Sequence, residues 1–246
     1  MNLIIDIGNT RTKVAVVEEQ QVVDNLMFEP LCESDVQDVI SKYPTIDKAI
    51  VASTAQSAES VVEWLRNMGL YVVEMSSLTP VPLRNGYLTP ETLGMDRLAA
   101  AVGASQLVGS DCLVVDFGTA ITIDLVIDGE FRGGNISPGM RTRFRALHDY
   151  TSRLPVCEAT DEVLPIGQTT SQAIEQGVMQ GITYEIEGYI EAFLSKNVKL
   201  SIIFTGGDAN FFVNRIKNAI FAKYDLVVCG LNTILEYNAK NLEQNI

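Results

Sequence analysis

The first thirteen residues read MNLIIDIGNTRTK, and this stretch, Met1–Lys13, decides how the rest of the chain is interpreted. An apolar run, Leu3–Ile5, predicts a buried strand that ends at the carboxylate of Asp6. A turn with Gly8 follows, and a second strand is expected from Thr12. A carboxylate beside a turn rich in backbone N–H donors suits a metal-bound phosphate. An ordinary β-hairpin uses the same residue types, so this stretch alone leaves both interpretations open.

The same pattern recurs near the middle of the chain, where residues 113–122 read LVVDFGTAIT. An apolar strand again ends in an aspartate, Asp116, and a glycine, a threonine and a second strand follow. A third apolar strand runs into Thr205-Gly206-Gly207, and paired glycines let a backbone lie close against a ligand. An Asp-Gly-Thr turn in each half predicts two similar halves that face one cleft, and three such strand ends in this order are far more specific than any one of them.

The composition argues against several classes of protein. The chain has 246 residues, enough for one large or two modest domains, and its net charge of −13 opposes binding to nucleic acid phosphates. No apolar stretch reaches the roughly 18 residues of a membrane helix, and we expect no signal peptide. The four cysteines form no Cys-x-x-Cys pair and there is one histidine, so a structural zinc site is not expected. Free thiols of this kind fit a cytoplasmic protein.

Hydrophobic periodicity predicts that each half begins with a meander of three strands and continues with helices and strands. This order implies a mixed sheet with helices on its faces. The first helix is expected to have Ser34 as its N-cap, and the longest helix carries an apolar stripe suited to a core or a subunit contact. The expected strands cover 3–7, 12–17, 22–28, 48–53, 71–75, 112–116, 122–127, 130–135, 201–204 and 225–228, and the expected helices cover 35–43, 57–68, 98–108, 171–197, 211–221 and the residues from about 140 and from 231.

Three carboxylates, those of Asp6, Asp96 and Asp116, stand next to glycine or threonine turns, which suits phosphoryl transfer. One or two of them would hold Mg²⁺, an ion that keeps several waters, and a third would accept the proton of a hydroxyl. Thr10 and Thr119 would hydrogen-bond phosphate oxygens. Asp96 also fits an ordinary N-cap, although the adjacent Arg97 makes an anion site plausible. Arg141 and Arg145 share a helix face, which is consistent with a solvated surface.

The two Asp-x-Gly-x-Thr-type turns and the late Thr-Gly-Gly resemble the acetate and sugar kinase/Hsp70/actin (ASKHA) superfamily. Within it the chain is similar to the type III pantothenate kinases over nearly its whole length. This resemblance implies an α/β fold with two duplicated ribonuclease-H-like (actin-like) halves, 1–110 and 111–246. Each half would be a mixed sheet flanked by helices, with the active site in the cleft between them. The motifs that carry the resemblance are DIGNTRTK at 6–13, GMDR at 94–97, DFGTAIT at 116–122 and GGNISPG at 133–139.

The resemblance also implies a function, the ATP-dependent phosphorylation of pantothenate to 4′-phosphopantothenate, which is the first step of coenzyme A biosynthesis. Asp96 would be the general base, and Asp6 and Asp116 would be the metal ligands. The implied ions are Mg²⁺ and a monovalent cation, K⁺ or NH₄⁺, which would bind at Asp116. A homodimer is implied, in which the helix over 171–197 is a reasonable contact. The implied ATP contacts are Asp6, Ile7, Gly8, Asn9, Thr10, Arg11, Thr12, Lys13 and Thr119, and the implied pantothenate contacts are Tyr87, Gly94, Met95, Asp96, Arg97 and Thr170.

Two other functions stay open on the sequence. The chain could be another small-molecule kinase of the same superfamily with a different acceptor, which a panel of substrates would reveal. It could instead be a non-catalytic relative that acts as a transcriptional accessory factor. The presence of all three aspartates argues against lost catalysis, and the acidic charge argues against direct contact with DNA.

Overall fold

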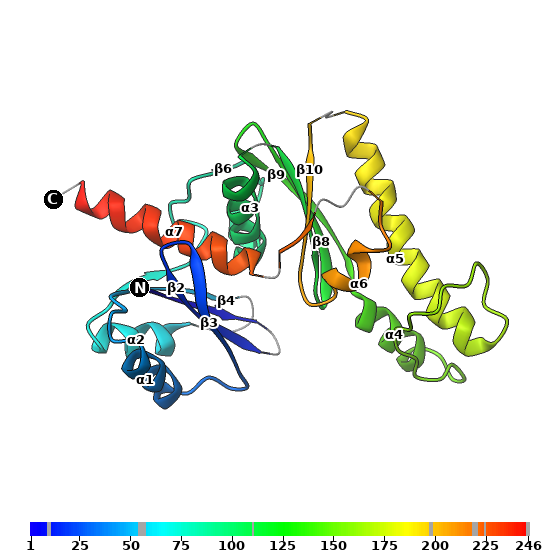
Figure 1. The fold of residues 1–246 in the computed structure, drawn as a ribbon, viewed down its shortest axis with the longest axis horizontal. Coiled ribbons are helices and arrows are strands. Elements are labelled where there is room, and N and C mark those ends of the chain that lie inside the picture. The colour runs from blue at the N-terminus through cyan, green and yellow to red at the C-terminus, as the bar shows by residue number, and fades with distance from the viewer. Residues whose placement is uncertain are drawn as a thin grey trace. The chain divides into compact units, whose positions relative to one another are not determined.

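The computed structural model describes residues 1–8, 11–53, 58–109, 111–196, 199–217, 221–223 and 225–244 (Figure 1). Contacts between residues divide the chain into two compact units. The first unit consists of residues 1–109, 129–132 and 225–246, and the second consists of residues 110–128 and 133–224.

The first unit is built on a mixed sheet of five strands in the order β3-β2-β1-β4-β5. β1 (Asn2–Ile7), β2 (Thr12–Glu18) and β3 (Gln21–Phe28) form the predicted antiparallel meander. β4 (Lys48–Ser53) and β5 (Tyr71–Glu74) continue the sheet as parallel strands on the other side of β1. This mixed order follows from the connections, because tight turns join antiparallel strands whereas helical crossovers join parallel ones.

Two helices, α1 (Glu33–Lys42) and α2 (Glu59–Asn67), cover one face of this sheet and lie together in Figure 1. Their apolar residues pack on alternate strand residues, since side chains of a strand alternate between the two faces. α1 begins earlier than expected, and the predicted N-cap Ser34 lies inside it. Cys32 is the cap instead, because its backbone N–H donates to the carboxylate of Asp35 at 2.8 Å.

The other two helices of the first unit, α3 (Met95–Val108) and α7 (Leu226–Glu243), pack against each other and contact β4. Their backbones approach closely at a glycine. A Cβ atom on Gly230 would lie only 1.8 Å from the carbonyl oxygen of Ala99. This close approach ties the C-terminal helix to the first unit.

The C-terminal segment therefore departs from two expectations. The predicted strand over 225–228 is wrong, because these apolar residues form the buried first turn of α7. The expected halves, 1–110 and 111–246, also differ from the units at this end of the chain, since residues 225–246 group with the first unit.

The second sheet contains six strands in the order β11-β10-β7-β8-β9-β6. β7 and β8 are antiparallel, whereas β10 and β11 run parallel to β7. The edge strand β6 belongs to the first unit and pairs with the first residues of β9, which also belong to it. The bounds are β6 (Arg84–Asn85), β7 (Cys112–Phe117), β8 (Ala120–Ile127), β9 (Glu130–Pro138), β10 (Ser201–Thr205) and β11 (Phe221–Ala222), and a short 3₁₀ helix covers Pro90–Thr92.

Three helices, α4 (Met140–Asp149), α5 (Thr170–Leu194) and α6 (Ala209–Val213), pack on the second sheet. The apolar stripe of α5 is buried in this core, so these side chains are not an exposed dimer contact. The buried members of the stripe are Ile174, Val178, Ile182, Ile186 and Ile190.

The helix expected over 211–221 is much shorter than predicted, because α6 ends at Val213 and β11 begins at Phe221. None of the helices in the described part of the chain combines the length and the apolar composition that crossing a membrane requires.

Candidate active site

The first predicted phosphate turn joins β1 and β2 in the first unit. Asp6 lies opposite Lys13 in the strand register, and the backbone N–H of Gly8 donates to the carbonyl oxygen of Arg11 at 3.0 Å. Arg11 forms an ion pair with Glu29, the residue after the end of β3. Ile7 and Thr12 face each other as the last pair of the ladder. The predicted contacts Asn9 and Thr10 lie outside the described residues.

The carboxylate of Asp6 is the most perturbed acid of the first unit. Its pKa is raised from 3.8 to about 6, and burial is the largest cause of this rise. The charge of Asp96 also contributes to the rise, whereas the charge of Lys13 opposes it. The structure thus brings Asp6 and Asp96, which are far apart in the sequence, within electrostatic range. Two partly desolvated carboxylates that repel each other make a place where a cation is favoured.

Asp96 lies in the first turn of α3, where the chain has little room. The backbone N–H of Arg97 donates to Asp96 Oδ1 at 2.8 Å. A Cβ atom on Gly94 would lie 2.5 Å from the same oxygen, so only glycine leaves this carboxylate in place. Met95 is the first residue of the helix and its side chain is buried. The GMDR motif therefore fixes the position of one carboxylate oxygen.

Arg97 is buried, with 6% of its surface exposed, and it lies against two aromatic rings. Its guanidinium carbon is 5.7 Å from the ring centroid of Tyr87 and 5.9 Å from that of Phe131. The two rings are themselves 6.0 Å apart. The structure thus brings the predicted substrate residues Tyr87 and Arg97 together. Sequence reasoning missed Phe131, because its only signal is its place in a strand, which any core phenylalanine shares.

The second predicted phosphate turn joins β7 and β8 in the second unit. The backbone N–H of Gly118 donates to the carbonyl oxygen of Ala120 at 3.1 Å. The carbonyl oxygen of Thr119 accepts two bonds, from the N–H of Gly139 at 3.0 Å and from the hydroxyl of Thr142 at 2.7 Å. The turn is thereby attached to the beginning of α4.

The backbone of two other loops lies directly against this second turn. A Cβ atom on Gly139 would lie 2.1 Å from the carbonyl oxygen of Gly118. Gly206 has a φ of +92°, and a Cβ atom there would lie 2.3 Å from Asp116 Oδ1. Only glycine accommodates both the positive φ and the close approach. The Thr-Gly-Gly segment therefore lies against Asp116, and the Ser-Pro-Gly segment lies against Gly118 and Thr119.

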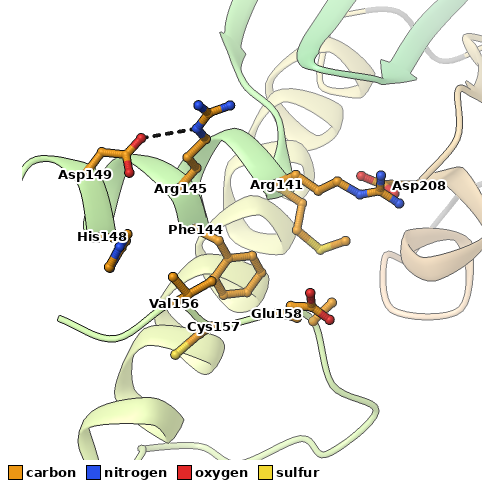
Figure 2. A pocket seen from close by; sticks show the side chains of 11 residues that line it. Arg141, Phe144, Arg145, His148, Asp149, Val156, Cys157, Glu158 and Asp208 are labelled. Carbon is orange, nitrogen blue, oxygen red and sulfur yellow. Dashed lines mark hydrogen bonds and ion pairs between the residues drawn. The ribbon is translucent and has the colours of Figure 1, made fainter. Parts of the chain in front are cut away.

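A cavity of about 700 Å³ begins beside this turn and extends along α4 (Figure 2). Arg141 points toward Asp208, whose backbone N–H donates to Phe117 at 3.1 Å. Burial raises the pKa of the Asp208 carboxyl, and the charge of Arg141 opposes that rise. The lining residues are Met140, Arg141, Phe144, Arg145, His148, Asp149, Val156, Cys157, Glu158, Ala159 and Asp208.

Two arginines that the sequence assigned only to a shared helix face lie at this cavity. Arg141 and Arg145 line it, and Arg145 pairs with Asp149 at 3.2 Å. Arg143 turns the other way and donates to the carbonyl oxygen of Pro138 at 2.7 Å. The spacing of the arginines along one helix face was the only sequence signal for this cavity.

Thr170 lies on a different cavity of the second unit. It is the first residue of α5, and the preceding Thr169 caps the helix by accepting the N–H of Gln172 at 3.2 Å. Thr170 lines an apolar hollow of about 850 Å³ between α4 and α5, which shares no lining residue with the cavity beside Asp208. Thr142 also lines this hollow, and its hydroxyl donates to the carbonyl oxygen of Thr119. Thr170 is therefore connected to the second turn only through Thr142.

Within the described part of the chain, no three acidic, histidine or cysteine side chains gather to hold a metal ion by themselves. An ion at Asp6 or Asp116 would therefore take most of its ligands from water and phosphate oxygens. Magnesium accepts such a ligand set, since it commonly binds through one or two carboxylates together with waters and substrate phosphates.

Known proteins resemble this chain over most or all of its length. Residues 2–192 match a family model described as Type III pantothenate kinase. A type III pantothenate kinase of Phocaeicola vulgatus is 43% identical over 242 residues, which cover 98% of this chain and 100% of the relative.

Solved structures show the same architecture. A conserved putative Baf family transcriptional activator from Campylobacter jejuni has a TM-score of 0.62 at 24% identity, covering 97% of this chain and 99% of that one. MreB 5 of Spiroplasma citri bound to AMPPNP has a TM-score of 0.51 at 13% identity, covering 100% of this chain and 98% of that one. At these identities the likeness concerns the fold alone. It confirms the predicted actin-like ASKHA fold, with two mixed sheets flanked by helices.

Proposed function

The chain belongs to the type III pantothenate kinases, and from this membership we propose that Asp96 is the base that deprotonates the hydroxyl of pantothenate. As the hydroxyl oxygen forms its bond to the γ-phosphorus of ATP, the Asp96 carboxylate accepts the proton. The bond from the γ-phosphorus to the bridging oxygen breaks, and 4′-phosphopantothenate and ADP result.

The observation that carries this proposal is the electrostatic coupling of Asp96 to Asp6, the carboxylate of the first phosphate turn. A base for phosphoryl transfer must stand close to the transferred group, since positioning supplies most of the catalysis. Asp96 fits this requirement because it lies within electrostatic range of Asp6, the carboxylate of the first turn. The Asp96 carboxylate also accepts a hydrogen bond from the backbone N–H of Arg97, which holds it in one orientation.

The acceptor pocket of this proposal consists of Tyr87 together with the GMDR motif. Arg97 pairs with the carboxylate of pantothenate, because a guanidinium fork matches a carboxylate in two parallel hydrogen bonds. The Tyr87 ring lies 5.7 Å from that guanidinium and forms one wall. Gly94 and Met95 contribute backbone close to the base, and Thr170 is a further acceptor contact.

ATP is held in this proposal by both turns. In the first unit, residues 6–13 surround the phosphates, and Lys13 brings a positive charge to the position opposite Asp6. In the second unit, Thr119 contacts the nucleotide, and the cavity beside Arg141 and Asp208 receives the nucleoside because it opens next to the turn. This cavity is large enough and mixed enough in polarity for a base and a sugar.

The ions of the proposal are Mg²⁺ and a monovalent cation, K⁺ or NH₄⁺. Asp6 fits a cation because its burial and the charge of Asp96 both favour neutralisation. Asp116 fits the monovalent cation because its carboxylate lies in a turn enclosed by backbone. When bound, magnesium neutralises charge on the transferring phosphate. The proposal also includes a homodimer, whose contact must use surfaces other than the buried stripe of α5.

Replacing the proposed base tests this function. We expect Asp96→Asn to fold and to bind ATP within about threefold of the unchanged protein, while turnover falls about 10²- to 10⁴-fold, the usual contribution of a general base. ADP release with Mg-ATP and pantothenate measures turnover, and ATP titration measures binding. Asp47→Asn is a matched control, because Asp47 is an exposed aspartate of the same unit.

Several outcomes would decide against parts of the proposal. Turnover of Asp96→Asn at the unchanged rate would remove Asp96 as the base. Turnover that needs pantothenate but not potassium, when sodium replaces it, would remove the cation from Asp116 and keep the kinase. Phosphorylation of another small-molecule alcohol, with none of pantothenate, would assign a different acceptor.

A further inference from the structure

Phe131 occupies a position that the proposed chemistry does not use. It is the second residue of β9, it is fully buried, and its neighbours Glu130 and Arg132 form an ion pair at 2.9 Å. Its ring faces Arg97 and Tyr87, the two side chains assigned above to the pantothenate carboxylate and its surroundings. Phe131 therefore lies behind the acceptor pocket.

The backbone of β9 also holds the segment that carries Tyr87. Asn85 pairs with Phe131 in the strand register, and the N–H of Gly86 donates to the Phe131 carbonyl oxygen at 2.9 Å. The N–H of Tyr87 donates to Asn85 Oδ1 at 3.0 Å. A Cβ atom on Gly86 would lie 2.7 Å from Glu130 Oε1 and 3.0 Å from the Phe131 carbonyl oxygen. The tyrosine is thus linked to β9 through the backbone of the two residues before it and through its own ring.

The arrangement constrains the one charged group of the cluster. A guanidinium attracted to the faces of two aromatic rings loses freedom of orientation, and the attraction is stronger where water is excluded. With 6% of Arg97 exposed, solvent contributes little to holding it. The two rings, at 5.7 and 5.9 Å, limit the positions that the guanidinium can take.

We propose that Phe131 is a positioning residue for acceptor recognition, which holds Arg97 and Tyr87 so that the guanidinium meets the carboxylate of pantothenate. This inference rests on the proposed function, since Arg97 must be the residue that pairs with that carboxylate. Phe131 itself does not touch the acceptor. Its loss therefore weakens recognition of the carboxylate and leaves the reaction of a bound acceptor largely intact.

The test compares pantothenate with pantothenyl alcohol, which has an uncharged hydroxymethyl group in place of the carboxylate. In the unchanged protein, kcat/KM favours pantothenate. We expect Phe131→Leu and Phe131→Met to reduce that preference about tenfold, mainly through a higher KM for pantothenate, while the KM for ATP changes less than twofold. Methionine keeps most of the volume without the ring, so it separates the aromatic attraction from simple filling of space.

A second variant changes an exposed residue next to Tyr87, so it tests the same contacts without a substitution in the core. Gly86→Ala places a Cβ atom 3.0 Å from the Phe131 carbonyl oxygen, so the segment of Tyr87 and β9 must adjust slightly, and we expect a smaller loss of preference for pantothenate in the same direction. Leu65→Val is the control, because Leu65 is a fully buried residue of the same unit in the cluster under α1 and α2. It should alter kcat/KM for both acceptors equally.

The outcomes separate this inference from the function beneath it. If Arg97→Lys lowers the preference for pantothenate and the Phe131 variants do not, Phe131 has no positioning role and the function stands. If the Phe131 variants reduce both acceptors equally, as Leu65→Val does, the residue is only structural. If Arg97→Lys leaves the preference unchanged, the assignment of Arg97 fails first, and the inference fails with it.

Discussion

The two predicted phosphate turns have similar sequences but different surroundings. In the first turn, Asp6 faces the charges of Asp96 and Lys13, and its carboxylate is held at a raised pKa by burial. In the second turn, the backbone of Gly206 lies against Asp116, with no space there for a Cβ atom. The first turn is thus governed mainly by electrostatics and the second mainly by steric fit.

Because of this difference, we expect the two turns to contribute to ligand binding in different ways, although their sequences are similar. Charge repulsion between carboxylates is relieved by a ligand, so the first turn gains most when cation and phosphate bind. A turn fixed by backbone contacts is already formed without ligand, so the second offers a preorganised wall. Substitutions should therefore act through charge in the first turn and through shape in the second.

The largest effect in this comparison is expected at Gly206. Gly206→Ala places a Cβ atom 2.3 Å from Asp116 Oδ1 and 2.7 Å from the backbone of Phe117, at a φ of +92°. The second turn must then shift, and a displacement of about 1 Å in a catalytic site costs about 100-fold in rate. We expect kcat/KM for ATP to fall by at least about 100-fold, as measured by ADP release.

A glycine of the second unit outside the proposed site supplies the control for this substitution. A Cβ atom on Gly188, in α5, would have no atom within 4 Å, so Gly188→Ala should leave turnover within about twofold. Equal losses in both variants would mean that the steric account of the second turn is wrong.

An intermediate effect is expected when the charge of the first turn is removed. Asp6→Asn eliminates a carboxylate whose pKa is raised from 3.8 to about 6, and the metal-free protein should become more stable at pH 7. The gain in the free energy of unfolding is at most about 3 kcal/mol, the equivalent of this shift. Turnover should fall at the same time, because Asp6 is a proposed metal ligand. Denaturant unfolding and ADP release measure the two changes.

The gain in stability from Asp6→Asn should increase with pH. Below pH 3.8 Asp6 is protonated in both the folded and the unfolded protein, so the gain from Asp6→Asn is absent. Between pH 3.8 and about 6 the unfolded state releases the proton while the folded state keeps it, and the stability of the unchanged protein falls. Above about pH 6 the difference is constant. A gain that is already full at pH 4 would contradict the electrostatic account.

The smallest effect is expected at Thr142, whose hydroxyl donates to the Thr119 carbonyl oxygen at 2.7 Å. Thr142→Val removes one hydrogen bond near the surface, worth about 1 kcal/mol, from a turn that glycine contacts already hold. We expect the KM for ATP to rise no more than about threefold. Thr151→Val is the control, since it removes a bond of the same length to Leu147 at the other end of α4. A much larger rise for Thr142→Val would mean that hydrogen bonding, rather than backbone contact, fixes the second turn.

Much of the fold could be predicted because its signals are local. Alternation and apolar runs identified both meanders, and β4 begins and ends where expected, at Lys48 and Ser53. The strand predicted over 225–228 failed for the opposite reason. Its short run of leucine and valine is compatible with strand and helix, and the contact of Gly230 with Ala99 on α3 selects the helix.

The candidate site divides in the same way. Its motifs indicate which residues carry chemistry, because glycine, aspartate and threonine at fixed spacing suit phosphate whatever surrounds them. The coupling of Asp6 to Asp96 and the cavity along α4 could not be predicted, since each joins residues distant in sequence. The roles of the individual site residues stay predictions until the variants are measured.

Residue types and their spacing along the chain were enough to predict the family, both meanders and the two aspartate-containing turns, because these depend on local sequence. The three-dimensional structure was needed to group α7 with the first unit, to bury the stripe of α5 in the core, and to bring Phe131 against Arg97 and Tyr87. The physical reason is that burial and charge coupling depend on distance in space, and an apolar or aromatic residue has the same local pattern whichever partner it meets.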